Sequence, residues 1–299
     1  MNDQLLQELN SFRDWVRWVS SEFERAELFY GHGSDNSWDE ALWLVLWAIK
    51  QPWGRLEWVM DARLAQSEKS TILDLAQQRI GTRKPLAYLT GEAWFAGERF
   101  IVSEDTLVPR SPIAELIASE FAPWLQEHPE RILDMCTGSG CIGIICAKQF
   151  VDAQVDLVDI SPEALAVAHQ NIALHELASR VVAKCSDGFT ALDSARYDVI
   201  VSNPPYVSEY EYAQLEDEYK AEPKLGLTSG EDGFDFTEML LREAANYLNP
   251  NGLLIVEVGH GWRGLQEKHP HVPFMWPEFE HGGDGIFILS REQLIAFRD

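Results

Sequence analysis

The tetrapeptide Asn203-Pro204-Pro205-Tyr206 combines the residue types best suited to do chemistry in this sequence. It follows an apolar run typical of a buried strand, and two consecutive prolines cannot continue a strand ladder because each lacks a backbone N–H. A strand end followed by an ordinary loop would satisfy this pattern. The alternative is a rigid binding site: the Asn203 side-chain oxygen and the Pro204 carbonyl can accept the two hydrogens of a planar amino group, while the Tyr206 ring packs on it.

A pair of acceptors of this kind addresses a specific chemical difficulty. The nitrogen lone pair of an amide or an aromatic amine is delocalised, so the nitrogen attacks a methyl group poorly. Two acceptors fix the nitrogen beside a methyl donor and stabilise the positive charge that develops as the new bond forms. The tetrapeptide therefore favours methyl transfer to a planar nitrogen, provided that a methyl donor binds next to it.

A glycine-rich turn is a candidate site for such a donor. The run from Asp134 to Gly143 (DMCTGSGCIG) lies between a predicted strand and a predicted helix, and its three glycines fit the pattern G-x-G-x-x-G. Asp159 ends the next apolar run, where a carboxylate can accept hydrogen bonds from both ribose hydroxyls of an adenosine group. An acid that simply begins the helix after Ser161 is the alternative interpretation of Asp159.

The turn Ser186-Asp187-Gly188-Phe189 is a weaker signal of the same kind. Asp187 can accept a hydrogen bond from the exocyclic amine of adenine, and Phe189 can pack nearby. Together the three turns predict a ligand that contains adenosine, and they leave both NAD and S-adenosylmethionine open.

Alternating strands and helices must position these turns. Five apolar runs follow one another from residue 131 onward (RILDM, QVDLVDI, RVVAK, YDVIVS and GLLIVEV), with helical candidates between several of them. This alternation predicts an α/β fold with a parallel sheet flanked by helices. A Gly-Gly-Asp-Gly turn then leads to IFILS, a predicted last strand that runs antiparallel at the edge.

The first part of the chain has a different character. Seven of the 11 tryptophans lie between Trp15 and Trp58, at spacings that predict helix packing rather than base stacking. Ser37 and Glu40 are in register for a capping box, and a second helix is predicted over Glu68–Ile80, closed by Gly81. Short β-type runs broken by glycines from residue 85 predict a hairpin. The predicted domains are a helical substrate-recognition domain (1–84), a β-hairpin linker (85–110) and a catalytic domain (111–299).

The composition excludes several classes of protein. The net charge of −24 disfavours a partner rich in phosphate and favours a basic one, and residues 205–240 alone hold ten Asp or Glu against two Lys. For the acidic residues elsewhere on the surface, a role in keeping the protein soluble is an equally good explanation. The N-terminus lacks a signal-peptide pattern, and the longest apolar run, Ala41–Ile49, is too short to span a bilayer. Four cysteines without metal spacing predict no metal site, and we expect a cytoplasmic protein.

Taken together, DMCTGSGCIG, VDLVDIS, SDGF and NPPY resemble the class I S-adenosylmethionine-dependent methyltransferases that act on planar nitrogens. Within that group, RKPLAYLTGEAWFAGERF, LVPRSP and EPKLGLTSGEDGFDF make nearly the whole chain similar to the protein-glutamine N-methyltransferases. The resemblance implies a doubly wound, mostly parallel sheet of seven strands, with S-adenosyl-L-methionine as cofactor and a glutamine side-chain amide as acceptor.

Two branches of this family come into question. One methylates a glutamine of ribosomal protein L-three of the large subunit, and the other methylates the GGQ glutamine of peptide-chain release factors. The release-factor branch typically has PRPDTE where this chain has Ser111-Pro112-Ile113-Ala114-Glu115 after Arg110, and a tryptophan where it has Gly188. LVPRSPIAELI and TSGEDGFDF look more like the ribosomal branch, whereas Gly226 departs from the family's usual alanine. We therefore expect a basic protein partner, ribosomal protein L-three before release factors, and no membrane or direct nucleic-acid binding.

The resemblance also implies roles for individual residues. Asn203, Pro204, Pro205 and Tyr206 are implied to be catalytic and to bind the substrate amide, with Glu222 and Pro223 shaping the substrate channel. Phe100, Pro109 and Arg110 are implied either to close over the cofactor or to serve as a structural linker. The residues implied to bind the cofactor are Asp134, Cys136, Thr137, Gly138, Ser139, Gly140, Asp159, Ile160, Asp187, Gly188, Phe189 and Asn203.

Two other functions are consistent with parts of this pattern. Related enzymes use the same tetrapeptide to methylate an exocyclic amine of adenine or guanine in nucleic acid, but the strongly negative charge argues against that substrate. A non-catalytic cofactor-binding assembly factor would have lost Asn203 or the glycine-rich turn, and both are intact.

Overall fold

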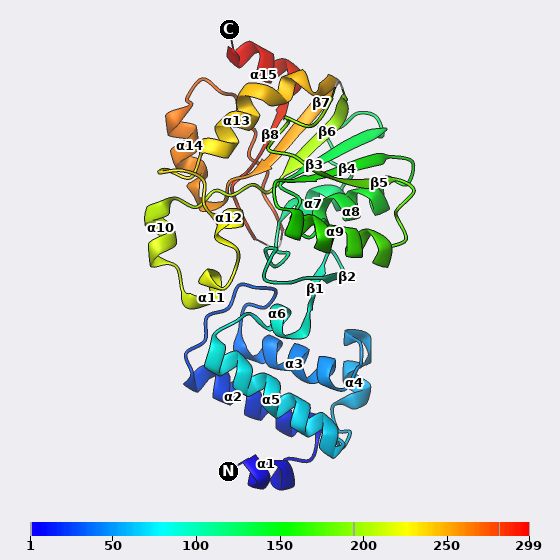
Figure 1. The fold of residues 1–299 in the computed structure, drawn as a ribbon, viewed down its shortest axis with the longest axis vertical. Helices are drawn as coiled ribbons and strands as arrows, with labels where there is room; N and C mark the ends of the chain where they lie inside the picture. Colours follow the sequence, from blue (N-terminus) through cyan, green and yellow to red (C-terminus); the bar gives the residue numbers. More distant parts are fainter. Residues whose placement is uncertain (1, 194, 281, 299) are drawn as a thin grey trace. The chain divides into compact units, whose positions relative to one another are not determined.

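The computed structural model describes residues 2–193, 195–280 and 282–298, and the chain divides into two compact units (Figure 1). The helical unit comprises Met1–Glu92 together with a short distant segment, Glu216–Ala221. The sheet unit comprises Ala93–Leu215 and Glu222–Asp299. The chain therefore leaves the sheet unit once, after Leu215, and returns to it at Glu222.

The helical unit is built on the long helices α2, α3 and α5, whose apolar faces meet in a core that includes Trp15, Phe23, Leu44 and Ile72. The predicted tryptophan-rich helical region is therefore present, and its Trp15 ring is a core residue. The elements are α1 (Asn2–Glu8), α2 (Phe12–Arg25), α3 (Ser37–Ala48), η1 (Trp53–Arg55), α4 (Leu56–Val59), α5 (Gln66–Thr82), α6 (Leu86–Thr90) and α11 (Asp217–Lys220).

Two predicted helix ends in this unit were wrong. Asn36, not Ser37, caps α3, because the Asn36 side chain accepts the backbone N–H of Asp39 at 2.9 Å. Helix α5 continues through Gly81 to Thr82 and ends at Arg83, which adopts the left-handed conformation at φ +61°. The Arg83 guanidinium donates to the carbonyls of Ala26 and Glu27, so tertiary contacts favour a left-handed residue where the local sequence favoured glycine.

The sheet unit contains one six-stranded sheet in the order β5-β4-β3-β6-β7-β8. Five strands are parallel and β8 is antiparallel at the edge, as predicted for IFILS. The strands are β3 (Arg131–Met135), β4 (Gln154–Asp159), β5 (Val181–Cys185), β6 (Tyr197–Ser202), β7 (Leu248–Glu257) and β8 (Ile286–Ser290).

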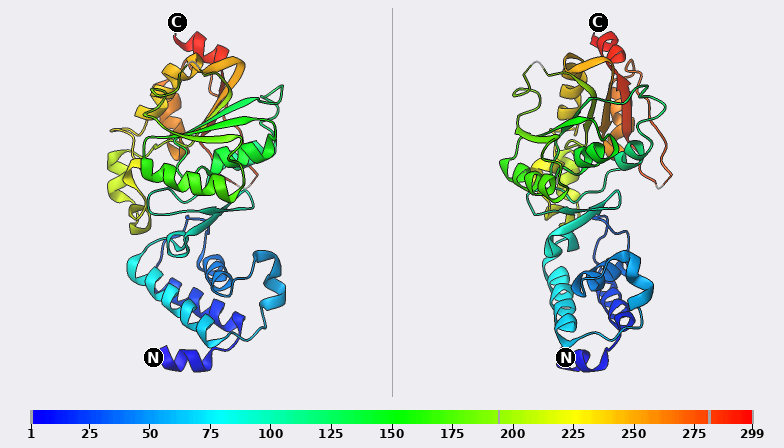
Figure 2. Two further views of the ribbon diagram at one scale, coloured as in Figure 1. Left: turned by 45° about the vertical axis from the view of Figure 1, so that its right-hand side comes forward. Right: turned by 90° about the vertical axis from the view of Figure 1, so that its right-hand side faces the viewer.

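Helices cover both faces of this sheet, which makes the fold doubly wound (Figures 1 and 2). Successive strand residues point to opposite faces, so that Ile132 packs under α7, α8 and α9, whereas Leu133 packs under the helices of the other face. The helices and 3₁₀ turns are α7 (Ile113–Ala118), α8 (Cys141–Gln149), α9 (Pro162–Leu174), α10 (Glu209–Gln214), α12 (Lys224–Leu227), α13 (Asp235–Glu243), η2 (Ala244–Asn246), η3 (Gly259–Gly261), α14 (Trp262–Lys268) and α15 (Arg291–Arg298).

The sheet differs from the implied one in its number of strands. It has six strands in the residues described, not seven. On the free side of β8, Met275 forms a single isolated antiparallel bridge with Ile288, which also pairs with Ile255 of β7. One bridge is too short to count as a strand, so Met275 only occupies the place beside β8 where a seventh strand would pair.

The predicted hairpin is present, and the division between the two units falls within its first strand, between Glu92 and Ala93. It consists of β1 (Glu92–Phe95) and β2 (Glu98–Ile101), which pair in a sheet of their own. The segment just before it is a short helix, α6, rather than the β-type run expected from its sequence. Among the residues described, no helix is both long and apolar enough to cross a membrane.

Candidate active site

A cavity of about 590 Å³ opens at the carboxyl edge of the parallel strands, within the sheet unit. Its wall is made mainly by the turns that follow β3, β4, β5 and β6, and by parts of the segments 104–111, 223–229 and 235–239. Ligands of doubly wound folds bind at this edge, and the volume is in the range of small-molecule sites.

The turn after β3 is held by a buried carboxylate. Asp134 Oδ2 accepts the Thr137 hydroxyl at 2.5 Å and the backbone N–H of Gly143 at 2.9 Å. Gly143 must be glycine, because a Cβ there would overlap Leu157 and come within 2.9 Å of Asp134 Cβ. Burial raises the pKa of Asp134 to about 7, even though both hydrogen bonds lower it. Asp134 therefore supports the turn from beneath and does not itself line the cavity.

Asp159 ties the turns after β3 and β4 together. Its Oδ2 accepts the backbone N–H of Gly138 at 2.9 Å, and its Oδ1 accepts that of Ser161 at 3.0 Å. Burial raises its pKa, and these backbone bonds oppose the rise. The carboxylate lines the cavity, and each oxygen has a further lone pair for a ligand. The two interpretations of Asp159 are thus compatible: it orders the start of α9 and also faces the cavity.

The turn after β5 is only partly in the wall. Asp187 and Gly188 line the cavity, but Phe189 does not. The Phe189 ring stacks on Tyr247, with centroids 4.3 Å apart, in the core on one face of the sheet. Phe189 thus supports this turn from behind instead of packing on a ligand.

The tetrapeptide after β6 lies directly beside the glycine-rich turn. Met135 and Ser202 are paired residues of the adjacent parallel strands β3 and β6, and the Ser202 hydroxyl donates to the Met135 carbonyl at 2.7 Å. The next residues along the two strands are Cys136 and Asn203, and both line the cavity. The register of two strands thereby brings two turns together that are far apart in the sequence.

A buried glutamate positions Tyr206. Glu257, at the end of β7, accepts the Tyr206 hydroxyl at 3.2 Å and the Ser111 hydroxyl at 2.5 Å. Gly259 leaves room for the ring, because a Cβ there would come within 2.8 Å of Tyr206 Cε2. Burial raises the pKa of Glu257, while its two hydroxyl donors lower it. The sequence offered one signal for Glu257, a charged residue inside the apolar run GLLIVEV.

A second carboxylate fixes the opposite wall. Glu222 accepts both Nη groups of Arg110 at 2.6 Å each, and the backbone N–H of Val108 at 2.9 Å. Five residues later, the Leu227 carbonyl accepts the backbone N–H groups of Tyr206 (3.1 Å) and Val207 (2.8 Å). The segment that follows Glu222 therefore braces the Asn-Pro-Pro-Tyr turn.

The structure gathers most, but not all, of the predicted site residues at the cavity. Those in its wall are Pro109, Arg110, Cys136, Thr137, Gly138, Ser139, Asp159, Ile160, Asp187, Gly188, Asn203, Pro205, Tyr206 and Pro223. Asp134, Gly140, Phe189, Pro204 and Glu222 lie behind this wall. Phe100 is fully buried and packs against His175, with centroids 4.8 Å apart, so it is a core residue rather than a cover for the cofactor. Val108, Ser111 and Leu227, which belong to the wall, and Glu257, which supports it, were missed.

Comparison with known proteins decides the family. A family model described as "Methyltransferase small domain" matches residues 115–218. Over 297 residues the chain is 45% identical to a ribosomal protein uL3 glutamine methyltransferase of Francisella tularensis subsp. tularensis, covering 99% of this chain and 95% of the relative. A protein of the same name from Bordetella pertussis is 45% identical over 296 residues, with 98% and 99% covered.

This chain belongs to the ribosomal protein uL3 glutamine methyltransferase family. The predicted family and branch are thereby confirmed, and the enzyme uses S-adenosyl-L-methionine as its methyl donor. Among solved structures, the catalytic domain of hMettl16 in complex with an RNA hairpin of the MAT2A 3′UTR matches with a TM-score of 0.51 at 14% identity. That match covers 75% of this chain and 81% of the other, and it shows the fold alone.

Proposed function

We propose that this enzyme transfers a methyl group from S-adenosyl-L-methionine to the side-chain amide nitrogen of a glutamine in ribosomal protein uL3, the ribosomal protein L-three of the large subunit. The pairing of Met135 with Ser202 is the observation that carries the proposal. It sets Asn203, which can recognise an amide, next to Cys136 in the turn suited to the methyl donor. The two relatives that match nearly the full length carry the same activity in their names.

The wall of the cavity fits the donor. The wall residues of the glycine-rich turn, Cys136 to Ser139, would face its methionine part, with Gly140 and Asp134 behind them, and Asp159 with Ile160 would hold the ribose hydroxyls. Asp187 and Gly188 contact the adenine, with Phe189 behind them. When bound, the donor supplies a methyl group on a positively charged sulfur.

The residues of the tetrapeptide act on the acceptor. The Asn203 side-chain oxygen accepts one amide hydrogen of the glutamine, and the Tyr206 ring packs against the planar group. Pro204 itself lies behind the wall, but it stands between the wall residues Asn203 and Pro205, and we assign the second amide hydrogen to its backbone carbonyl. In methyl transfer a nitrogen–carbon bond would form as the donor's sulfur–carbon bond breaks, which leaves S-adenosylhomocysteine, and the positively charged methylated nitrogen would release one proton to water. No strong base is needed early in the reaction, because the nitrogen becomes acidic only after methylation.

The charge around the cavity favours a basic protein over nucleic acid. Arg110 is the only Lys or Arg of the described wall, and it is paired with Glu222. Five exposed acids belong to the wall, namely Glu104, Asp105, Glu163, Asp187 and Asp235. Phosphate groups would be repelled there, whereas a basic ribosomal protein would be attracted.

Residues outside the cavity complete the proposal. We assign substrate recognition to the helical region 1–84, with Pro223 in the wall of the substrate channel and Glu222 fixing its position. We infer a cytoplasmic location, because the proposed substrate is a ribosomal protein.

Methyl transfer can be tested directly. The enzyme is incubated with tritiated S-adenosyl-L-methionine and, separately, with uL3, a release factor, RNA or DNA, and the labelled residue is located by mass spectrometry. We expect label on one glutamine of uL3. Label on nucleic acid and none on uL3 would exclude the proposal.

The variant Asn203→Ala tests whether this residue acts on the acceptor or on the donor. It should lower kcat by about 10²–10³, as the loss of an oriented hydrogen-bond partner of the transition state does, and leave the affinity for the cofactor unchanged. An equal loss of cofactor affinity would instead show that Asn203 serves the donor and not the acceptor.

A further inference from the structure

The segment Glu216–Ala221 links the two units of the chain in an unusual way. It follows the Asn-Pro-Pro-Tyr turn in sequence by about ten residues, yet it packs as part of the helical unit. The chain leaves the sheet unit after Leu215, forms the short helix α11, and re-enters the sheet unit at Glu222. A feature that holds this segment on the helical unit therefore also restrains the active-site segments joined to it.

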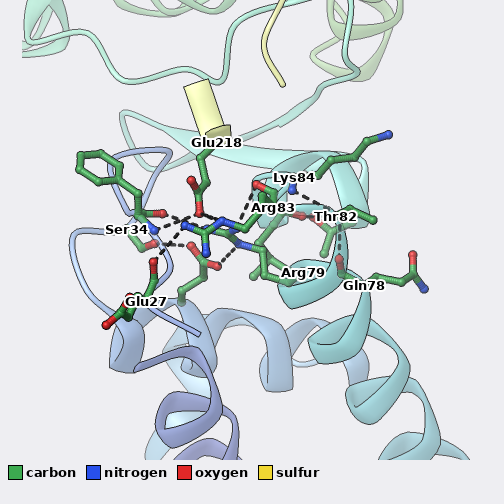
Figure 3. Close-up of polar contacts among 12 residues, drawn as sticks. Glu27, Ser34, Gln78, Arg79, Thr82, Arg83, Lys84 and Glu218 are labelled. Atoms are coloured by element: carbon green, nitrogen blue, oxygen red, sulfur yellow. Dashed lines mark hydrogen bonds and ion pairs between the residues drawn. The ribbon is translucent and has the colours of Figure 1, made fainter. Parts of the chain in front are cut away.

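A buried carboxylate holds the segment. Figure 3 shows the side chain of Glu218 pointing toward the guanidinium groups of Arg79 and Arg83. Glu218 Oε1 accepts the backbone N–H of Phe29 at 3.0 Å and lies 2.9 Å from Arg83 Nε and 3.5 Å from Arg79 Nη1. Its side chain is 0% exposed, so the carboxylate cannot exchange these partners for water.

The cluster around Glu218 is nearly closed and electrically balanced. Arg79 also binds Glu40, with Nε 2.7 Å from Oε1, and donates to the Phe29 carbonyl at 3.0 Å. Two glutamates thus face two arginines, and the side chains of Glu40, Arg79 and Glu218 are at most 3% exposed. Removing one charge from such a cluster leaves the opposite charges buried and uncompensated, which is strongly destabilising.

Aromatic contacts add to the hold on the segment. The Tyr219 ring lies 5.6 Å from the Phe29 ring and 4.5 Å from the His32 ring, measured between centroids. Gly31 lies against its hydroxyl, since a Cβ there would come within 2.9 Å of that oxygen. The segment is therefore fitted into the helical unit and does not merely pass over it.

The other end of the segment is fixed in the sheet unit four residues later. Glu222 is bound there by Arg110 and Val108, and the chain continues from it to Leu227, whose carbonyl accepts the N–H groups of Tyr206 and Val207. A short covalent path thus runs from Glu218 to Glu222, then to Leu227, and from there by hydrogen bonds to the tetrapeptide.

We propose that Glu218 is a positioning residue: by binding Arg79 and Arg83 it holds Glu216–Ala221 folded within the helical unit, and through the continuous chain it restrains the adjoining wall segment 222–229, which braces the Asn-Pro-Pro-Tyr turn. This inference rests on the proposed function. The turns assigned to the cofactor follow other strands, so the tether governs methyl transfer to the protein substrate and leaves cofactor affinity unchanged.

Glu218→Gln and Glu40→Gln form a matched pair that tests the tether. Each removes one charge from the same buried cluster and keeps the shape of the side chain. Glu40 contacts Ser34 and Arg79 within the helical unit, so its variant weakens that unit without directly releasing residues 216–221. Glu218→Gln weakens the unit and also releases the segment.

Three measurements separate the variants: kcat and KM with uL3, the affinity and stoichiometry of S-adenosylhomocysteine by calorimetry, and the rate of trypsin cleavage after Lys220, located by mass spectrometry. For Glu218→Gln we expect kcat per cofactor-binding molecule to fall about tenfold, corresponding to about 1.4 kcal/mol, and cleavage to accelerate by a similar factor. Cofactor affinity should stay within about twofold of the wild type. For Glu40→Gln, kcat and cleavage should both remain near the wild-type values.

Equal losses of kcat in the two variants would overturn the proposal, because they would indicate general destabilisation. Wild-type kcat and wild-type cleavage in Glu218→Gln would overturn it as well. If Glu218→Gln does not fold, Glu218→Asp, which keeps the charge on a shorter side chain, replaces it in the same comparison. If the wild-type enzyme does not methylate uL3, the proposed function fails, and the cleavage rates then decide the tether alone.

Discussion

Replacing Arg110 by methionine tests how strongly the wall of the cavity depends on Glu222. The Glu222 side chain is 0% exposed, and its carboxylate accepts hydrogen bonds from the two Nη groups of Arg110 at 2.6 Å and from the Val108 N–H at 2.9 Å. Methionine keeps the apolar length of the arginine stem but removes both Nη donors and the positive charge. The carboxylate would then stay buried without its charged partner.

The burial of the Arg110–Glu222 pair sets the expected loss of unfolding free energy. Removing one partner of a buried ion pair costs about 3–5 kcal/mol of unfolding free energy. The Arg110 side chain is 25% exposed, so water screens part of the interaction and we expect a loss of about 3 kcal/mol. Glu222→Gln should cost less, about 1–2 kcal/mol, because the amide oxygen still accepts the Val108 N–H and Arg110 reaches water. The double variant combines Arg110→Met with Glu222→Gln. Its loss of unfolding free energy should be about 2 kcal/mol smaller than the sum of the two single losses.

Urea unfolding of the four proteins measures this coupling. The two units can unfold in separate transitions, and S-adenosylhomocysteine identifies that of the sheet unit, because a ligand of the folded state shifts only the transition of the unit that binds it. The reasoning would be refuted if the loss in the double variant equalled the sum of the two single losses to within about 0.5 kcal/mol. Such additivity would mean that Arg110 and Glu222 do not stabilise each other.

Three further predictions concern residues beneath or beside the cavity. The pKa of Asp134 is raised from 3.8 to about 7, so its contribution to stability is complete below pH 3.8 and is lost as the pH rises through 7. Asp134→Asn should therefore gain about 3 kcal/mol relative to the wild type between roughly pH 5 and 8 in urea unfolding, whereas parallel pH profiles would contradict the shift. Gly143→Ala should cost about 1–3 kcal/mol and weaken cofactor binding in calorimetry, with partial rescue by Leu157→Ala, because the new methyl overlaps Leu157. Tyr206→Phe should cost about 1–2 kcal/mol by leaving Glu257 short of a donor, and unchanged stability in thermal unfolding would show that this bond is weak.

The local pattern of the chain was enough to predict the strands that carry the site. Each is an apolar run ended by glycine, proline or a polar turn, and each was found as a strand. The glycine-rich turn and Asp159 lie in the cavity wall as expected, because consecutive parallel strands must present their carboxyl ends at one edge. Helix ends were less predictable: two neighbouring polar residues could cap α3, and the local bond to Asp39 is made by Asn36, whereas Arg83 at the end of α5 binds the distant carbonyls of Ala26 and Glu27.

The acidic stretch from residue 205 to 240 contains two acids whose burial the sequence did not reveal. It was interpreted as a surface that attracts a basic partner, but Glu218 and Glu222 are fully buried in ion pairs. Two other acids of the stretch, Glu209 and Asp232, bind Lys224 and Lys268. Two of the ten acids of the stretch are thus used inside the protein and six others are exposed, while four of the five exposed acids of the cavity wall come from other segments.

The sequence by itself determined the order of strands and turns, and with it the donor turn, the acceptor turn and the family. These follow from residues that are neighbours in the chain, because apolar periodicity and turn chemistry are local properties. Only the tertiary structure decided which carboxylates are buried, since Glu218 and Arg79 are 139 residues apart and Glu222 and Arg110 are 112 apart. Whether an acidic side chain is a surface charge or an internal anchor depends on a partner that no local pattern can specify.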